Sequence, residues 1–149
     1  MKKSYFLIKI LIMFFLICTN LYAAKSNFYS KGKILYESKK FDESKIFFER
    51  DIVFNPKNER SYLYLAKIYN NLENIEEEEN NLNSVLLLNP KNDEAIYMLT
   101  LIKIEQSDYD EAKRLIDKFS LVCKSFCTKK SEIQKKFNKL IPSNEKSKN

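Results

Sequence analysis

The sequence has no histidine and only one glycine among its 149 residues. Histidine is the commonest general base, a frequent zinc ligand and the usual partner of a nucleophilic serine or cysteine, so most familiar catalytic arrangements are excluded. The single glycine, the three prolines and the lack of alternating β-branched runs argue against a β-sheet protein. We therefore expect an all-α chain that is not an enzyme and uses no cofactor or metal.

The net charge of +6 is unevenly distributed along the chain. Residues 25–123 carry 15 basic and 18 acidic side chains, whereas residues 124–149 carry 8 basic and 2 acidic ones. A lysine-rich terminal segment is usually a solvated surface, although it can also contact anionic lipid or polymer. No basic face interleaved with aromatic residues accompanies this charge, so we do not expect nucleic acid as a partner.

Residues 1–24 have the layout of a secretory signal peptide. Two lysines open the segment, an apolar run follows over Ile10–Cys18, and small residues end it. The run is shorter than the roughly 20 residues that span a bilayer as a helix. We expect cleavage after Ala23 or Ala24 and export to the periplasm or cell envelope. Bulky residues stand three positions before either cut, so an uncleaved membrane anchor stays open as an alternative.

A regular repeat runs through the middle of the chain. Pro56 and Pro90 each lie in an Asn-Pro-Lys-Asn quartet, and their spacing sets a period of about 34 residues, in the range typical of repeat architectures. Ungapped rows of this length that start at Lys25, Glu59 and Asp93 place apolar or small residues in shared columns. Column 4 holds Phe28, Tyr62 and Ile96; column 8 holds Gly32, Ala66 and Thr100; column 17 holds Phe41, Ile75 and Tyr109; column 24 holds Phe48, Leu82 and Ile116.

This pattern resembles the tetratricopeptide repeat family, whose period is about 34 residues. The resemblance extends from residue 25 to about residue 122 and implies repeats at 25–58, 59–92 and 93–126. It also implies a right-handed helical solenoid of three helix pairs, because a single amphipathic pair cannot bury its apolar face alone. The family function implied is that of a protein-binding adaptor or scaffold without a small-molecule substrate.

The chain changes character after the third row. Residues 129–141 place Ile133, Phe137, Leu140 and Ile141 at helical spacing among lysines. This spacing predicts an amphipathic capping helix that covers the last apolar face of the solenoid. We expect residues 142–149 to form a disordered tail.

Columns 5, 9 and 12 predict a partner-binding stripe, because the family's first helices line a concave groove and these columns lie beside the core positions. Three tyrosines and three large aliphatic residues are unusual for a surface that meets only water, and tyrosine is enriched at binding hot spots. We expect the partner to be an apolar peptide or helix segment. The alternative is that some of these side chains only pack between repeats. The residues are Tyr29, Lys33, Tyr36, Leu63, Lys67, Asn70, Tyr97, Leu101 and Ile104.

Cys123 and Cys127 are the cysteines that remain if the signal segment is removed. A helical spacing of four places two Cα atoms about 6 Å apart, which is within disulfide range. In an oxidising compartment we expect a structural disulfide. A thiol-disulfide exchange role is the alternative, although redox catalysts usually present a C-x-x-C pair on a thioredoxin-like fold.

The second row departs from the pattern at column 20, which holds Ser44 and Ala112 in the other rows but Glu78 here. Glu78 belongs to the run Glu76–Glu79, in the first turn of an expected helix, where negative charge is favoured by the helix dipole. A calcium site is the alternative interpretation. Consecutive helical carboxylates diverge around the axis, however, whereas calcium needs 6 to 8 converging oxygens.

Overall fold

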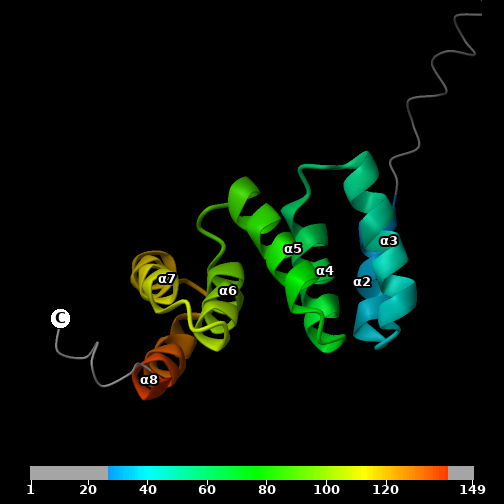
Figure 1. Cartoon of the computed structure of the whole chain (residues 1–149). Helices are drawn as coiled ribbons and strands as arrows, with labels where there is room; N and C mark the ends of the chain where they lie inside the picture. Colours follow the sequence, from blue (N-terminus) through cyan, green and yellow to red (C-terminus); the bar gives the residue numbers. More distant parts are fainter. Residues whose placement is uncertain (1–26, 141–149) are drawn as a thin grey trace, which may run out of the picture.

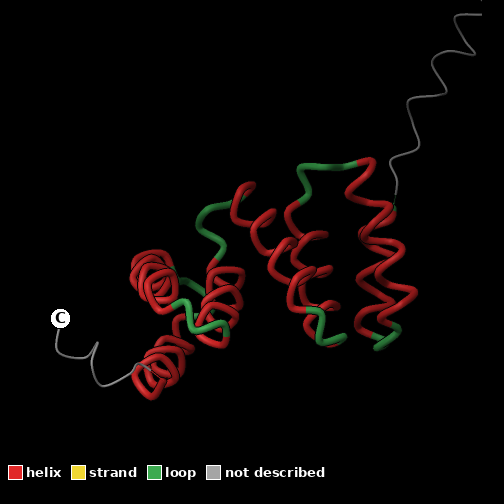
Figure 2. Tube along the Cα trace, viewed as in Figure 1, coloured by secondary structure: helices red, strands yellow, loops and turns green. Residues whose placement is uncertain are grey.

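The computed structural model describes residues 27–140, and every element in that range is a helix. The predicted signal segment 1–24, Ile141 and the predicted tail 142–149 lie outside the described residues. Six long helices form three antiparallel pairs, followed by a short 3-10 turn and one more helix (Figures 1 and 2). In order they are α2 Phe28–Glu37, α3 Phe41–Phe54, α4 Glu59–Asn71, α5 Ile75–Leu88, α6 Asp93–Glu105, α7 Tyr109–Val122, η2 Cys127–Lys129 and α8 Lys130–Leu140.

The turns inside the three pairs share one unusual backbone position. Lys39, Glu73 and Ser107 have φ values of 60°, 56° and 60°, the only positive values among the described non-glycine residues. All three stand at column 15 of the repeat rows. A side chain in this left-handed region is strained, and the repeat of the strain shows that the same tight turn joins the helices of every pair.

The connections between pairs begin at the asparagines that precede the prolines. Asn55 and Asn89 follow α3 and α5 with φ values of −131° and −138° and ψ values of 66° and 88°, which lie outside the α region that a following proline disfavours. Helices α5, α6 and α7 are capped at their N-termini by side chains. Asn74, Asn92 and Asp108 each accept a hydrogen bond from the backbone N–H three residues further along the chain.

The core lies where the two helices of each pair meet. Column 24 is buried in all three repeats, at Phe48, Leu82 and Ile116, and the small side chains of column 8 that face it are buried too. In the first pair, the hydroxyl of Ser44 also donates a hydrogen bond of 2.8 Å to the backbone carbonyl of Gly32. The predicted packing at columns 8 and 24 is therefore present in all three pairs.

Column 17 is covered in two pairs and exposed in one. Phe41 packs on Tyr36, and Tyr109 packs edge-on against Phe137 of the last helix. Ile75 is 45% exposed, so the expectation that it is a packing position is wrong. In the first pair the column 12 residue Tyr36 packs on the column 17 residue. In the second pair column 12 holds Asn70, whose amide donates hydrogen bonds to Glu78 and offers no apolar surface to Ile75.

Helix α8 covers the C-terminal end of the solenoid, against α6 and α7 (Figure 1). Ile133 and Phe137 are buried and join the core of the second and third pairs. Leu140 is 48% exposed, so the expectation that it packs on this face is wrong, and the expectation for Ile141 stays a prediction because that residue lies outside the described residues. Within residues 27–140, no helix is long and apolar enough to cross a membrane.

Candidate protein-binding face

An aromatic cluster joins the first helices of repeats one and two. Tyr29 and Tyr36 of α2 place their rings 6.0 Å and 5.0 Å from that of Tyr64 in α4. Tyr64 also stacks on the buried Phe48, with centroids 4.8 Å apart and planes only 7° from parallel. These half-buried rings form a surface that is apolar in body and carries hydroxyls at its edge.

Tyr64 is the member of this cluster that the column analysis missed. It stands at column 6, between the stripe column 5 and the core column 7. Tyr64 joins the cluster because its ring, at column 6 of the second repeat, contacts the ring of Tyr29, at column 5 of the first. The available signal was the excess of tyrosine in α4, which also contains Tyr62 and Tyr69.

Tyr36 and Tyr64 of the cluster stay protonated. Burial raises the pKa of Tyr36, and the carboxylate of Glu94 adds to the effect. Burial likewise raises the pKa of Tyr64, with smaller contributions from Tyr29 and Glu37. Each phenol is therefore available as a hydrogen-bond donor to a bound group over the whole neutral range.

The polar members of the stripe are already engaged to different degrees. Lys67 forms a 2.7 Å ion pair with Glu94, which links α4 to α6, and its ammonium lies 5.2 Å above the ring of Tyr64. Asn70 donates to both carboxylate oxygens of Glu78 at 3.2 and 3.0 Å. Lys33 lies at the exposed rim with only a long 3.6 Å pair to Glu37. Lys33 thus has the weakest of these contacts.

The C-terminal part of the stripe is largely covered. The hydroxyl of Tyr97 donates a 2.9 Å hydrogen bond to Glu132 of α8, and its ring contacts Phe126. Leu63 and Leu101 are half-buried against the core. Ile104 is only 3% exposed, so the expectation that it lies on the surface is wrong. It is buried because α6 is enclosed by α5, α7 and α8.

A cavity of about 580 Å³ lies beside the aromatic cluster, at the junction of α2, α3 and α4. Tyr29 belongs to both features. Within the cavity the buried carboxylate of Asp51 accepts hydrogen bonds from Asn58 and Ser61, each 2.6 Å long, and from Asn55 at 3.0 Å. Asp51 thus ties the end of α3 to the start of α4. The lining residues are Asn27, Tyr29, Ser30, Asp51, Asn55, Asn58 and Arg60.

Residues 59–92, which form the second row of the repeat, match the family model described as tetratricopeptide repeat. Residues 59–92 therefore form a tetratricopeptide repeat. No curated protein matches its sequence.

Several solved structures share this fold. One is the first tetratricopeptide domain of Spaghetti (RPAP3) bound to an HSP90 peptide, with a TM-score of 0.67, 18% identity, and coverage of 76% of this chain and 90% of that one. Another is the Yersinia enterocolitica type III secretion chaperone SycD with a peptide of the translocator YopD, with a TM-score of 0.67, 12% identity, and coverage of 76% and 89%. The Arabidopsis OM64 domain has a TM-score of 0.68, 19% identity, and coverage of 76% and 93%. At these identities the likeness establishes the fold alone.

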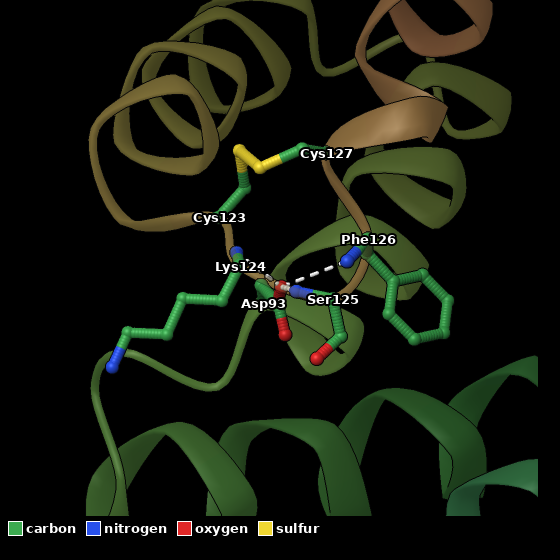
Figure 3. Close-up of a disulfide and its surroundings, with 6 residues drawn as sticks. All are labelled: Asp93, Cys123, Lys124, Ser125, Phe126 and Cys127. Carbon is green, nitrogen blue, oxygen red and sulfur yellow. Dashed lines mark hydrogen bonds between the residues drawn. A yellow bond between two sulfur atoms is a disulfide. The ribbon is translucent and has the colours of Figure 1, made fainter.

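The end of the third helix pair is organised around Asp93 (Figure 3). Its Oδ2 atom accepts hydrogen bonds from the backbone N–H groups of Lys124, Ser125 and Phe126, at 2.7, 2.7 and 2.9 Å. Burial of Asp93 alone would raise its pKa, but these backbone donors outweigh burial and hold the pKa below its usual value. The carboxylate therefore fixes the loop that leads from α7 to α8.

The two cysteines flank this loop. In the structure Cys123 and Cys127 are joined, with Cα atoms 5.1 Å apart, and their side chains lie at the end of α7 and the start of η2 (Figure 3). The loop closed by the sulfur atoms is the same loop whose amides surround Asp93. The bond and the carboxylate thus hold one segment from two sides.

The acidic run at the start of α5 divides into separate contacts. Glu78 is buried, and burial raises its pKa, with the Asn70 amide opposing this and Glu105 reinforcing it. Glu79 instead pairs with Lys103 and accepts from Gln106, both on the side of α6. Within residues 27–140, no group of three or more potential ligands could hold a metal ion.

Proposed function

We propose that this tetratricopeptide-repeat protein is a non-enzymatic adaptor that binds a segment of a partner protein along its first helices, in the cell envelope. The observation that carries the proposal is the cluster of Tyr29, Tyr36 and Tyr64 between α2 and α4. Half-buried tyrosines supply apolar contact area with little loss of side-chain freedom, which is the composition of binding hot spots.

The solved neighbours support a peptide as the ligand class. The Spaghetti domain is bound to an HSP90 peptide and SycD to a YopD peptide, and both share this fold. In the present chain the aromatic cluster favours apolar anchors on the partner. The exposed Lys33 at the rim favours an acidic or polar residue beside those anchors.

We also propose that the protein is exported, and the presence of the two cysteines supports this. The signal-like layout of residues 1–24 predicts passage out of the cytoplasm, and disulfides persist in oxidising compartments. The position of Cys123 and Cys127 around the Asp93 loop supports a structural bond rather than a redox centre, because the bond fixes a segment that covers Tyr97.

Site-specific photo-crosslinking in the producing cell tests the adaptor function. The probe replaces Lys33 on the rim of the aromatic cluster, and the control probe replaces Asp117 on the exposed side of α7. We expect one discrete adduct from Lys33 and none from Asp117. The adduct should disappear when Tyr36→Ala is added, while circular dichroism shows that the fold is retained.

Two outcomes would argue against the proposal. Equal adducts from both probe positions would indicate non-specific capture. An adduct at Lys33 that persists unchanged with Tyr36→Ala would show that the aromatic cluster is not the binding surface.

A further inference from the structure

Helix α3 has a second apolar face that points away from the core. Its inner side buries Phe48 and Ser44. On the other side, Ile46, Val53 and Phe54 are 46%, 75% and 66% exposed. At about 100° per residue, these three residues together with Phe47 and Arg50 fall within an arc of about 120°. We call these five residues, together with Phe28 and Lys31 of α2, the outer α3 face.

The outer α3 face is a continuous patch of rings and cations. The ring of Phe28 lies 5.5 Å from that of Phe54 and 6.4 Å from that of Phe47. The guanidinium of Arg50 and the ammonium of Lys31 each lie 6.0 Å from the centre of the Phe47 ring. Within this arc the acidic residue is Glu43, which is paired with Lys40 at the far end of the helix, while Asp42 and Glu49 lie just outside the arc.

This patch is only partly a property of the first repeat, because exposed aliphatic residues recur at column 29 as Val53, Leu87 and Leu121. Column 22 holds Ile46 here but Asn80 and Arg114 in the other repeats. Column 10 shows that the same end of the solenoid is uncovered. Ile34 is 64% exposed, whereas its counterparts Ile68 and Ile102 are 0% and 4% exposed, because a preceding repeat packs on them. Among residues 27–140, no helix covers the N-terminal end as α8 covers the C-terminal one.

The charges on the patch argue against a second copy as its occupant. In a two-fold symmetric dimer the same surface meets itself, so Arg50 and Lys31 of one copy would approach their equivalents in the other. Rings, aliphatic side chains and flanking cations are instead the composition of surfaces that settle into the headgroup region of a bilayer. Cations at such a surface favour anionic lipid.

The position of the apolar run Ile10–Cys18 supports the same occupant. Asn27 is the ninth residue after Cys18, which corresponds to at most about 30 Å of extended chain. Phe28, the first residue of α2, belongs to the outer α3 face. In the uncleaved chain, in which residues 1–24 remain attached, a bilayer that holds the apolar run is therefore within reach of the patch. We propose that the outer α3 face rests on a bilayer surface that contains anionic phospholipid.

The absence of tryptophan makes a direct test possible. Val53→Trp and Leu121→Trp each introduce one reporter at column 29 of a repeat, at positions that are 75% and 87% exposed. The full chain is reconstituted in vesicles of phosphatidylcholine and phosphatidylglycerol, with or without bromine on the acyl chains. We expect brominated lipid to quench Val53→Trp and to leave Leu121→Trp unchanged.

A charge reversal distinguishes contact of the outer α3 face with lipid from attachment of the chain through residues 1–24 alone. Lys31→Glu with Arg50→Glu leaves residues 1–24 intact, so quenching of Val53→Trp should be lost while the chain stays on the vesicle. No quenching of Val53→Trp, or equal quenching of both reporters, would overturn the proposal. Quenching that persists after charge reversal, or in pure phosphatidylcholine, would overturn the assignment to anionic lipid.

A second copy as occupant has its own signature. It would appear as a blue shift of Val53→Trp that grows with protein concentration in the absence of lipid, and that result would also overturn the proposal. The inference stands apart from the adaptor function. The charge reversals leave the aromatic cluster untouched, so the Lys33 crosslink should survive them.

Discussion

The ring of Phe48 in α3 lies 3.0 Å from the position that a Cβ atom would take on Gly32 in α2. This relationship recurs in graded form along the solenoid. Where column 24 holds a large ring, column 8 is glycine; where column 24 holds Leu82 or Ile116, column 8 is Ala66 or Thr100. The only glycine of the chain is therefore explained by the size of the residue that faces it.

Gly32→Ala should lower the stability of the fold, and Phe48→Leu should recover part of the loss. Overpacking a core costs about 1–3 kcal/mol, against about 1 kcal/mol gained from the helix preference of alanine. Urea denaturation of the two single variants and the double variant measures the coupling. A stabilising Gly32→Ala would show that the Phe48 ring moves aside freely.

Glycine at column 15 should stabilise the protein. Glu73 holds a φ of 56°, a conformation that costs a residue with a side chain roughly 1–2 kcal/mol and costs glycine almost nothing. Part of this gain is offset by the greater freedom of glycine in the unfolded chain. We expect Glu73→Gly to raise the melting temperature. Asn71→Gly, two residues earlier inside α4, is the control and should lower it.

Much of the helical frame could be predicted from the sequence, because columns 8 and 24 depend only on contacts within a helix pair. The binding stripe could not be predicted as well, since columns 5 and 12 depend on which helix comes next. Tyr97 is covered by α8, Ile104 is enclosed around α6, and Tyr64 gains its role from α2.

The outer α3 face was missed for a related reason. A periodicity argument assigns the apolar residues of a helix to one core face, and α3 has two apolar sides. Ile46 and Val53 each look like ordinary core residues when read alone. Only their shared exposure shows that they form a surface.

Glu78→Gln should raise the melting temperature at pH 7 and change it little at pH 4. Burial raises the pKa of Glu78 in the folded state. Stability is therefore greatest when the carboxyl is protonated in both states, and it falls as pH rises through the folded pKa. Glutamine keeps an acceptor for Asn70 without the charge. Calorimetry at the two pH values checks this, and an equal shift at both would exclude ionisation as the cause.

The pair Cys123→Ser and Cys127→Ser should reduce the free energy of unfolding of the oxidised protein. A loop this short contributes about 2 kcal/mol by the chain-entropy estimate. Titration of free thiols in the purified mature protein, which lacks Cys18 once residues 1–24 are removed, should find none until a reductant is added, and reduction should be slow. Rapid, reversible reduction at the potential of a cellular thiol pool would instead favour the thiol-disulfide exchange alternative.

Asp93→Asn should loosen the same loop even when the disulfide is intact. The carboxylate accepts three backbone N–H groups through one oxygen, and hydrogen bonds to a charged acceptor contribute about 1.5–3 kcal/mol each before partial exposure weakens them. We expect faster hydrogen exchange at the amides of Lys124, Ser125 and Phe126, and a lower melting temperature at pH 7.

The effect of Asp93→Asn on the melting temperature should depend on pH. Because the pKa of Asp93 is lowered in the folded state, its contribution is complete above the pKa of the unfolded chain and is lost as pH falls through the folded pKa. The gap in melting temperature between the natural protein and Asp93→Asn should therefore narrow in acid. Asp110→Asn, an exposed residue in the first turn of α7, is the control and should show no comparable gap at pH 7. A gap that stays constant down to low pH would mean that the asparagine disturbs the loop by its shape and not through the missing charge.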